Sequence, residues 1–238
     1  MTASGELDVV KAFAQVAVAM DAAESIAGAR LLVAALARDA LGSAGTAIWH
    51  LKADSTMELD SSTDPDFMVL MADIVGRKPD GPAWQTMQDR RVTLADDFST
   101  ETRWPGYVSR LVAESPVRSA VVYPLGLAQR DLGVLAVYSH QPRHFDAGLV
   151  ALGAVFAAYA SLALENADLA EKARNLAAAL GSNRRIGMAI GILMGRNNLT
   201  ESQAFDLLRV TSQNTNTKLS AVAEGVVLTG TIRTLGPA

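Results

Sequence analysis

Cysteine is absent from the 238-residue chain. Without a thiol there can be no disulfide framework, no thiolate nucleophile and no zinc or iron–sulfur site that needs cysteine ligands. A chromophore linked through a thiol is excluded for the same reason. The chain has only three histidines, His50, His140 and His144, and they stand as isolated residues near expected strand ends or loops. We therefore expect no metal site and no bound cofactor.

Long hydrophobic runs are also missing. The most apolar stretch, residues 149–164, contains glycine, serine and tyrosine, and it falls short of the ~20 residues that a membrane span needs. The N-terminal sequence MTASGELDVV lacks the basic start and apolar run of a signal peptide. These features predict a cytoplasmic protein with no membrane partner.

The motifs that mark common catalytic sites are lacking as well. The sequence contains no phosphate-binding loop, no Gly-x-Ser-x-Gly and no His–Glu pair. Asp96 and Asp97 are adjacent, so their side chains diverge on an extended chain and form no convincing acid–base pair. We expect no catalytic residues and no enzymatic activity.

Acidic residues outnumber basic ones, and the net charge of −4 taken alone argues against a nucleic-acid partner. The distribution changes that interpretation. From Glu171 onward there are eight basic and four acidic residues, a net charge of +4, which leaves −8 for the rest of the chain. An acidic body with a basic tail is expected when one part of a protein meets a polyanion, although ordinary variation could also produce a difference of this size.

Half of the residues are hydrophobic, so the chain is expected to fold. Strand-like runs all lie between residues 45 and 140, where they alternate with short helical patterns. They are TAIWHL, MELDSS, RVTL, VRSAVVYPL and LGVLAVYSH, the last two forming a hairpin. This pattern predicts an α+β domain in which an antiparallel sheet is flanked by helices.

From about Phe145 a helical pattern continues for some fifty residues, which is typical of a coiled coil or an interdomain connector. Leucines recur every seven residues, and the heptad positions d and a are filled by Leu162, Leu169 and Leu176, and by Asn166, Ala173 and Leu180, respectively. Leucine at d with one asparagine at a favours a parallel two-stranded homodimer. A single helix packing on its own domain is the alternative. Gly181-Ser182 is a possible interruption, which would make the junction flexible.

The C-terminal part is predicted to be helical. Thr200 begins a capping-box pattern with Gln203 and opens a helix to about Gln213; a polar break follows at Asn214 to Asn216, and a last short helix begins at Lys218. Glycines at Gly187, Gly191 and Gly195 leave one helix face nearly bare. Tight packing of another helix is the preferred explanation of that face, and close approach of RNA is the other.

Basic residues and amides gather in this C-terminal part. The candidate nucleic-acid contacts are Arg184, Arg185, Arg196, Arg209, Ser212, Gln213, Asn216 and Lys218. Arginine makes bidentate phosphate and base-edge contacts, and amides read bases. Phe205 is the only aromatic residue after Tyr159, which argues against a single-strand binder built on stacking. A structured RNA fits better.

The stretch ALGSNRRIGMAIGILMGR, together with ESQAFDLLRVTSQNTNTKLSAVAEGVV, closely resembles the ANTAR domain, a three-helix RNA-binding module of bacterial transcription antiterminators. The upstream segment DDFSTETRWPGYVSRLVAESPVRSAVVYPLGLAQRDLGVLAVYSHQPRHFD resembles the GAF domain that accompanies it in actinobacterial proteins. The resemblance implies a GAF-like sensor domain over residues 1–144, a connecting coiled-coil helix over 145–180 and an all-α ANTAR domain over 181–238.

What the resemblance implies for function is an antitermination regulator. ANTAR dimers bind paired stem-loops in nascent mRNA leaders and so prevent a terminator hairpin from forming. Arg185, Arg196, Arg209 and Lys218 would contact phosphates, and Ser212, Gln213 and Asn216 would read the loops. The family resemblance leaves open which of Arg184 and Arg185 faces the RNA, because the run Gly181-Ser182-Asn183 departs from the usual Ser-Arg.

The sensor domain is expected to respond to an unidentified small molecule or partner protein. Its candidate pocket residues are Trp49, Trp104, Tyr107, Tyr123 and Tyr138, each of which could equally belong to the core. Two other functions stay open. The terminal helices could form a DNA-binding helix-turn-helix, although Lys218 is the only basic residue in the first turns of the last helix. Alternatively, the chain could be a dimeric adaptor without a ligand.

Overall fold

The computed structural model describes residues 25–52, 54–75, 80–126 and 131–232. The chain divides into two compact units between Glu171 and Lys172, and each is considered by itself. The sequence also predicts a helical pattern over residues 7 to 41 and a turn, GLAQRD, between the last two strands. The part of that pattern before Ser25, and most of the turn, lie outside the described ranges.

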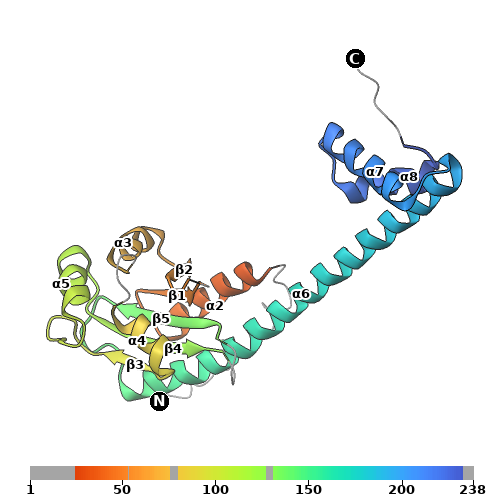
Figure 1. Ribbon diagram of the computed structural model, residues 1–238. Helices are drawn as coiled ribbons and strands as arrows, with labels where there is room; N and C mark the ends of the chain where they lie inside the picture. The colour runs from red at the N-terminus through yellow and green to blue at the C-terminus, as the bar shows by residue number, and fades with distance from the viewer. Residues whose placement is uncertain (1–24, 53, 76–79, 127–130, 233–238) are drawn as a thin grey trace. The chain divides into compact units, whose positions relative to one another are not determined.

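The first unit is built on one five-stranded sheet (Figure 1). Its elements are α2 (Ile26–Ala40), β1 (Gly45–Leu51), β2 (Met57–Ser62), α3 (Pro65–Val75), α4 (Pro82–Asp89), β3 (Thr93–Ala95), α5 (Pro105–Glu114), β4 (Ser119–Leu125), β5 (Gly133–Ser139) and the first part of α6 (Ala147–Asn197). The strand order is β2-β1-β5-β4-β3, and every pairing is antiparallel. The predicted α+β fold, with its antiparallel sheet and the β4–β5 hairpin, is confirmed.

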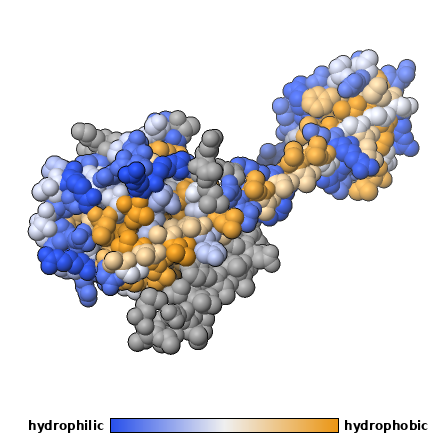
Figure 2. All heavy atoms as spheres, turned by 90° about the horizontal axis from the view of Figure 1, so that it is seen from below, coloured by the Kyte–Doolittle hydropathy of each residue, from blue (hydrophilic) through white to orange (hydrophobic). Residues whose placement is uncertain are grey.

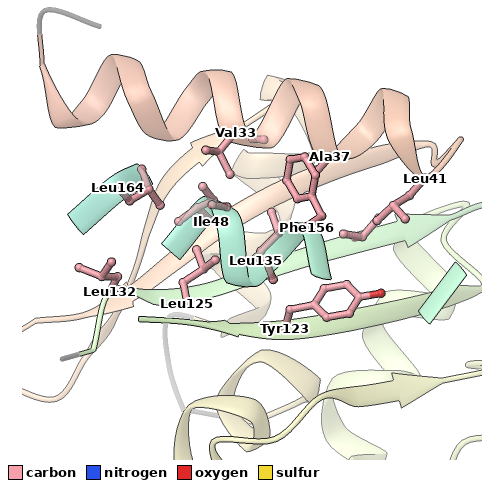
Figure 3. Packing of buried hydrophobic residues seen from close by; sticks show 14 of the residues in the cluster. Val33, Ala37, Leu41, Ile48, Tyr123, Leu125, Leu132, Leu135, Phe156 and Leu164 are labelled. Atoms are coloured by element: carbon pink, nitrogen blue, oxygen red, sulfur yellow. The ribbon is translucent and has the colours of Figure 1, made fainter. Parts of the chain in front are cut away.

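Two hydrophobic layers cover the two faces of this sheet. On one face α2 and α6 pack against the strands, and Figure 3 shows Phe156 of α6 between Ala37 of α2 and the sheet. On the other face the strands pack against α3, α4 and α5. Strand β4 contributes to both layers, since Tyr123 belongs to the first and Val122 to the second. Alternate residues of a strand point to opposite faces, so one strand joins the two layers.

Close contacts hold the start of α6 on the sheet. The hydroxyl of Tyr123 donates to the carbonyl of Val150 at 3.3 Å. Gly153 lies directly against the Tyr123 ring, where an added Cβ would overlap the ring and its hydroxyl. About two turns after Gly153, the Ser161 hydroxyl accepts a hydrogen bond from the Gly126 amide at 2.9 Å. The helix therefore bonds to the backbone next to β4 as well as packing on it.

Helix α6 is continuous from Ala147 to Asn197, so the predicted interruption at Gly181-Ser182 is wrong. A glycine inside a helix costs only about 1 kcal/mol relative to alanine. The preceding residues Ala177 to Leu180 are good helix formers, and they carry the helix across the glycine. A flexible junction at Gly181 is therefore not present in this structure.

The expectation that no segment is long and apolar enough to cross a membrane fails for α6. By length and composition α6 meets that criterion among the described residues, because it is 51 residues long and contains an 18-residue apolar window with at most two charged residues. The indication is weak. A third of its most apolar window is buried, and Phe156, Ala160 and Leu164 lie in the core of the first unit.

The second unit contains the end of α6, α7 (Glu201–Thr215) and α8 (Leu219–Thr229), the predicted three-helix arrangement. Their buried residues form one small core, made of Ala189, Leu193, Ala204, Leu208, Ala223 and Val226. The capping box at Thr200 and Gln203 is confirmed, with both reciprocal hydrogen bonds present. The polar break begins later than predicted, since α7 continues to Thr215 and ends at Asn216, whose φ is 49°.

Candidate functional site

The outer face of α7 carries two of the predicted contact residues. Ala204, Leu208 and Thr211 turn into the core, whereas Arg209 and Gln213, one turn apart, are exposed. The guanidinium Nη2 of Arg209 lies 3.1 Å from Asp206 Oδ1, and both side chains are at least half exposed. A surface ion pair of this kind contributes little, so Arg209 can exchange the carboxylate for a phosphate.

The turn between α7 and α8 brings three more candidates together. Asn216 stands in the left-handed region, which asparagine tolerates better than most residues, and its side chain is exposed. Lys218 occupies the N-cap position of α8 and is also exposed. Ser212 differs, because its hydroxyl donates to the Thr217 carbonyl at 2.6 Å. Ser212 therefore helps to close the turn, while Asn216 and Lys218 project from it.

The three arginines of α6 have different surroundings. Arg184 is exposed, and no ion pair forms with it in the part of the chain that the structure describes. Arg185 lies 3.6 Å from Glu224 of α8, with both side chains about half exposed. Arg196 donates through Nη1 to the carbonyl of Gly230 at 3.0 Å. Gly230 ends α8 with a φ of 74°, and an added Cβ there would overlap the Arg196 guanidinium.

The predicted RNA contacts thus fall into two groups. Arg196 and Ser212 bond to backbone carbonyls within their own unit, and Arg185 and Arg209 make exposed ion pairs. Arg184, Gln213, Asn216 and Lys218 make no side-chain hydrogen bond or ion pair with any described residue, so a ligand would meet no competing partner. Sequence alone did not separate the two groups, because both consist of ordinary basic and polar residues.

The glycine face of α6 is open. A Cβ added at Gly187, Gly191 or Gly195 would meet no atom within 4 Å. The preferred explanation from sequence, tight packing of another helix of this chain, does not apply within the described residues, because α7 and α8 pack on the face that holds Ala189 and Leu193.

All six residues of the predicted dimer seam are exposed along α6. The leucines at positions 162, 169, 176 and 180 are 48 to 63% exposed. Val155 and Tyr159 extend the same heptad register toward the N-terminus and are also exposed. Together they form the heptad face, which comprises Val155, Tyr159, Leu162, Asn166, Leu169, Ala173, Leu176 and Leu180. Figure 2 shows hydrophobic residues at the surface of α6 where it leaves the first unit.

The heptad face lies opposite the side of α6 that packs on the sheet. At 100° per residue, Val155, Leu162 and Leu169 fall on one side of the helix, and the buried Phe156, Ala160 and Leu164 on the other. Sequence analysis missed Val155 and Tyr159, although the spacing of seven was there to find. In this part of α6 nearly all residues are apolar, so the sequence does not distinguish the exposed heptad positions from the buried ones.

A hollow lies in the first unit between the sheet and helices α3, α4 and α5. Trp49 of β1 and Tyr138 of β5 line it, as predicted for the candidate pocket. Trp104 belongs to the same core but does not line the hollow, and Tyr123 lies on the opposite face of the sheet beneath α6. Strand β4 is apolar on both faces, so its sequence gave no indication of the side to which Tyr123 points.

Tyr107 of α5 lines the hollow as predicted, whereas Phe67, Phe98 and Asp80 were not predicted. Phe67 of α3 packs on Tyr138 with ring centroids 4.4 Å apart, and Phe98 packs on Tyr107 at 6.1 Å. Asp80, just before α4, is the one charged residue among the lining residues. Burial and the nearby Asp80 carboxylate raise the pKa of the Tyr107 hydroxyl far above its usual value. These residues lie in helices and loops that carried no recognisable motif.

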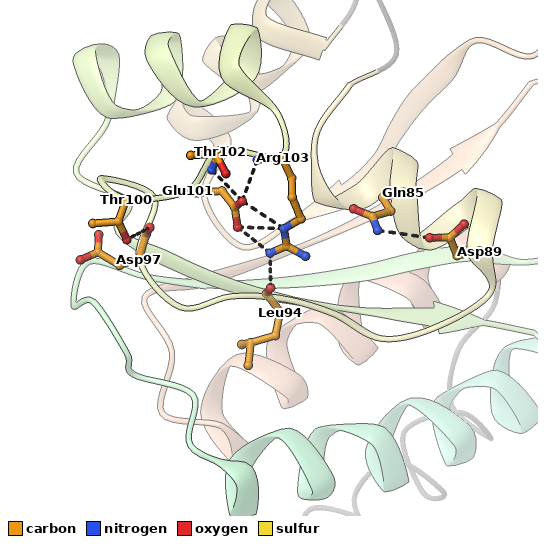
Figure 4. Close-up of polar contacts among 8 residues, drawn as sticks. All are labelled: Gln85, Asp89, Leu94, Asp97, Thr100, Glu101, Thr102 and Arg103. Carbon is orange, nitrogen blue, oxygen red and sulfur yellow. Dashed lines mark hydrogen bonds and ion pairs between the residues drawn. The ribbon is translucent and has the colours of Figure 1, made fainter.

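Arg103 fixes the loop that leads into α5, and Figure 4 shows its contacts with Glu101 and Leu94. The Arg103 guanidinium makes a forked contact with Glu101, donates to the carbonyl of Leu94 and lies 4.3 Å from the centre of the Trp104 ring. Bonding to Arg103 lowers the pKa of the Glu101 carboxyl from 4.5 to about 2. This cluster anchors the loop over the sheet edge and is structural.

Within the described ranges, no group of three histidine or acidic side chains is placed to hold a metal ion. His50 pairs with Glu58 at 3.3 Å, and His144 Nε2 lies 3.3 Å from the Leu41 carbonyl. Each of these histidines thus has a local partner.

Comparison with known structures shows the fold of the first unit. The GAF domain from an Acinetobacter phosphoenolpyruvate-protein phosphotransferase is 14% identical with a TM-score of 0.53, over 72% of this chain and 99% of that one. The free methionine-R-sulfoxide reductase from Neisseria meningitidis, solved with its substrate, is 16% identical with a TM-score of 0.56, over 71% and 95%. A GAF domain from a Coxiella burnetii phosphotransferase gives 15% and 0.54, over 70% and 98%. No curated protein matches the sequence.

Family models assign both parts of the chain. The GAF domain model matches residues 23–165, and the ANTAR domain model matches residues 174–227. The second match spans the end of α6, all of α7 and most of α8, and so covers the candidate contact residues. The chain belongs to the GAF domain family and carries a C-terminal ANTAR domain, so it combines a sensor domain with an RNA-binding antitermination module.

Proposed function

We propose that the chain acts in the cytoplasm as a homodimeric, non-enzymatic antitermination regulator. Each protomer binds one of two paired stem-loops in an mRNA leader and so prevents the terminator hairpin from forming. The GAF domain modulates this binding in response to a small molecule or partner protein. The observation that carries the proposal is the ANTAR match, which coincides with an exposed set of cations and amides.

The surface made by α7 and the following turn supports RNA as the ligand. Arg209 and Gln213 project from one face of α7, and Asn216 and Lys218 project from its C-terminal turn. Guanidinium and ammonium groups bind phosphates, and amides hydrogen-bond base edges in loops. Phe205 is 40% exposed and is the only aromatic residue of this unit, so stacking contributes at most one platform.

The heptad face supports the dimer. It presents leucines at one heptad position and a single asparagine at the other, exposed over the length from Val155 to Leu180. An exposed apolar stripe on a helix is costly in water unless a partner covers it. A second copy in parallel register covers it and pairs Asn166 with its twin.

An electrophoretic mobility shift tests the RNA proposal. The probes are a double stem-loop RNA, a single stem-loop RNA and duplex DNA of equal length, at one fixed salt concentration. We expect tight binding of the double stem-loop alone, and we expect Lys218→Ala and Arg184→Ala to weaken it without changing the melting temperature.

The control variant is Arg91→Ala, which removes an exposed arginine of the first unit and is expected to bind RNA like the unchanged protein. Preference for duplex DNA would favour the helix-turn-helix alternative. Equal, weak binding to all three probes would leave the basic tail as a non-specific surface and favour the dimeric adaptor.

A further inference from the structure

Aromatic rings from the sheet, from α3, from α5 and from the loop before α5 line the hollow of the first unit. Its aromatic residues are Trp49, Phe67, Phe98, Tyr107 and Tyr138. The remaining apolar lining consists of methionine, valine, alanine and proline side chains. Ring faces carry negative charge density and attract organic cations. The wall is therefore suited to a flat apolar group or to an alkylated ammonium.

Asp80 gives this wall its polarity. Among the described residues that line the hollow, none is a lysine, an arginine or a histidine. Asp80 Oδ1 accepts the Gly81 amide at 2.9 Å, at the start of α4, so this helix terminus already has its anion. Oδ2 accepts no hydrogen bond from the part of the chain that the structure describes. A carboxylate with one free oxygen beside aromatic rings favours a cation and repels an anion.

The hollow is small but its walls can adjust. Its volume in this structure is about 30 Å³, room for a water or two. Met71 of α3 borders it and Met87 of α4 lies in the same core, and methionine side chains rearrange readily around a guest. One part of the wall is fixed more closely. Gly81, with a φ of 93°, lies against the Tyr107 ring, where an added Cβ would collide with the ring.

We propose that this hollow binds a small aromatic or alkylated amine, held by cation–ring contacts and by the Asp80 carboxylate. The proposal rests on the sensor role given above to the GAF domain and names the chemical class of its signal. Phosphorylated and other anionic ligands should bind less tightly, since none of the described lining residues would neutralise them.

Three isosteric probes test the charge preference directly. Benzylamine, benzyl alcohol and benzoate are titrated into the full-length protein by calorimetry without RNA. We expect benzylamine to bind at least roughly tenfold more tightly than benzoate, the size of one cation–ring and carboxylate contribution, with the alcohol between them. Asp80→Asn should abolish that difference, while Asp89→Asn, an exposed aspartate at the other end of α4, should keep it.

Two further measurements separate the possible failures. Ala83→Leu, which narrows the hollow from α4, should weaken all three probes, and circular dichroism reports whether each variant folds. Binding of benzoate as tight as benzylamine, or binding of none of the three, would overturn the proposal. The mobility shift with RNA is run on the same samples: RNA binding without amine binding removes this inference alone and leaves the RNA-binding function standing.

Discussion

Arg196 and Lys218 are equivalent by charge, but the structure gives them different roles. Arg196 is bonded to the residue that caps α8 through the Gly230 carbonyl, and the absence of a side chain at Gly230 leaves room for its guanidinium. Lys218 projects from a turn with no side-chain partner among the described residues. A loss of RNA binding in a Lys218 variant would therefore indicate a lost contact, whereas the same loss in an Arg196 variant could come from a destabilised domain.

Replacing Arg196 by alanine should destabilise the ANTAR unit. The Gly230 carbonyl loses its charged donor, and we expect a loss of about 1 kcal/mol in unfolding free energy, the usual effect of such a hydrogen bond near the surface. Urea denaturation followed by circular dichroism measures it. Lys218→Ala is the control and should leave the transition unchanged; equal destabilisation by both variants would show that Arg196 has no special structural role.

Glu101 should make stability depend on acidity. Hydrogen bonds from Arg103 lower the pKa of the Glu101 carboxyl from the ordinary value of 4.5 to about 2 in the folded protein, so the folded state favours the charged form. The resulting stabilisation is complete above pH 4.5 and disappears as the pH falls toward 2. Thermal melts of the wild type and Glu101→Gln should differ at pH 6 and converge near pH 2. A constant difference across this range would contradict the assignment.

At the scale of elements, α6 has three different surfaces. Its first turns pack on β4 through Gly153 and Phe156, and its last turns pack on α7 and α8 through Ala189 and Leu193. The heptad face occupies the side that neither core uses. Glycine accordingly has opposite roles along one helix, since Gly153 is required by a neighbouring ring and Gly187 has open space beside it.

The same substitution should have opposite effects at these two glycines. Gly153→Ala drives a methyl group into the Tyr123 ring and should lower stability by about 1–3 kcal/mol. Gly187→Ala improves helix propensity and should raise stability by about 0.5–1 kcal/mol. Differential scanning calorimetry of the full chain checks both. Stability unchanged at Gly187 but RNA binding lost would indicate that the open glycine face contacts the ligand.

The heptad face should decide the oligomeric state. Leu176→Asp places a charge in the proposed seam and should yield monomers in sedimentation velocity, because two buried carboxylates would face each other. Ala178→Asp is the matched control, two residues away on the outer face of the same exposed stretch, and should remain dimeric. Identical sedimentation of both variants would refute the seam, whether the common species is a monomer or a dimer.

Helices, strands and the capping box could be predicted from the sequence because each rests on local periodicity. Thr200 and Gln203 define a helix start by themselves. Tyr123 could not be placed, since β4 is buried on both faces and its alternation has no polar side to orient it. The role of Arg196 depends on Gly230, distant in sequence, and the hollow depends on Asp80, which resembles any loop aspartate. Sites that arise from distant pairings carry no local signal.

For the whole molecule, the proposed dimer would carry two RNA-binding units, which implies avidity. Once one stem-loop is bound, the second binds at a high effective concentration, so paired stem-loops should bind roughly 10²-fold or more tightly than one. Leu176→Asp should reduce this ratio toward one while leaving affinity for a single stem-loop intact. A ratio that persists in monomers would mean that both stem-loops bind one unit.

The two-faced strand β4 has a consequence for how a signal could leave the sensor domain. Ala120 and Val122 form part of the floor of the hollow, and Val121 and Tyr123, their chain neighbours, form part of the seat of α6. A single strand, β4, therefore separates the hollow from the layer that contains α6. An occupant that pushed Ala120 and Val122 would also push Val121 and Tyr123 toward α6, because these residues are joined along one strand. The size of the bound molecule would then decide whether β4 moves. A molecule too small to push on β4 would bind without affecting α6.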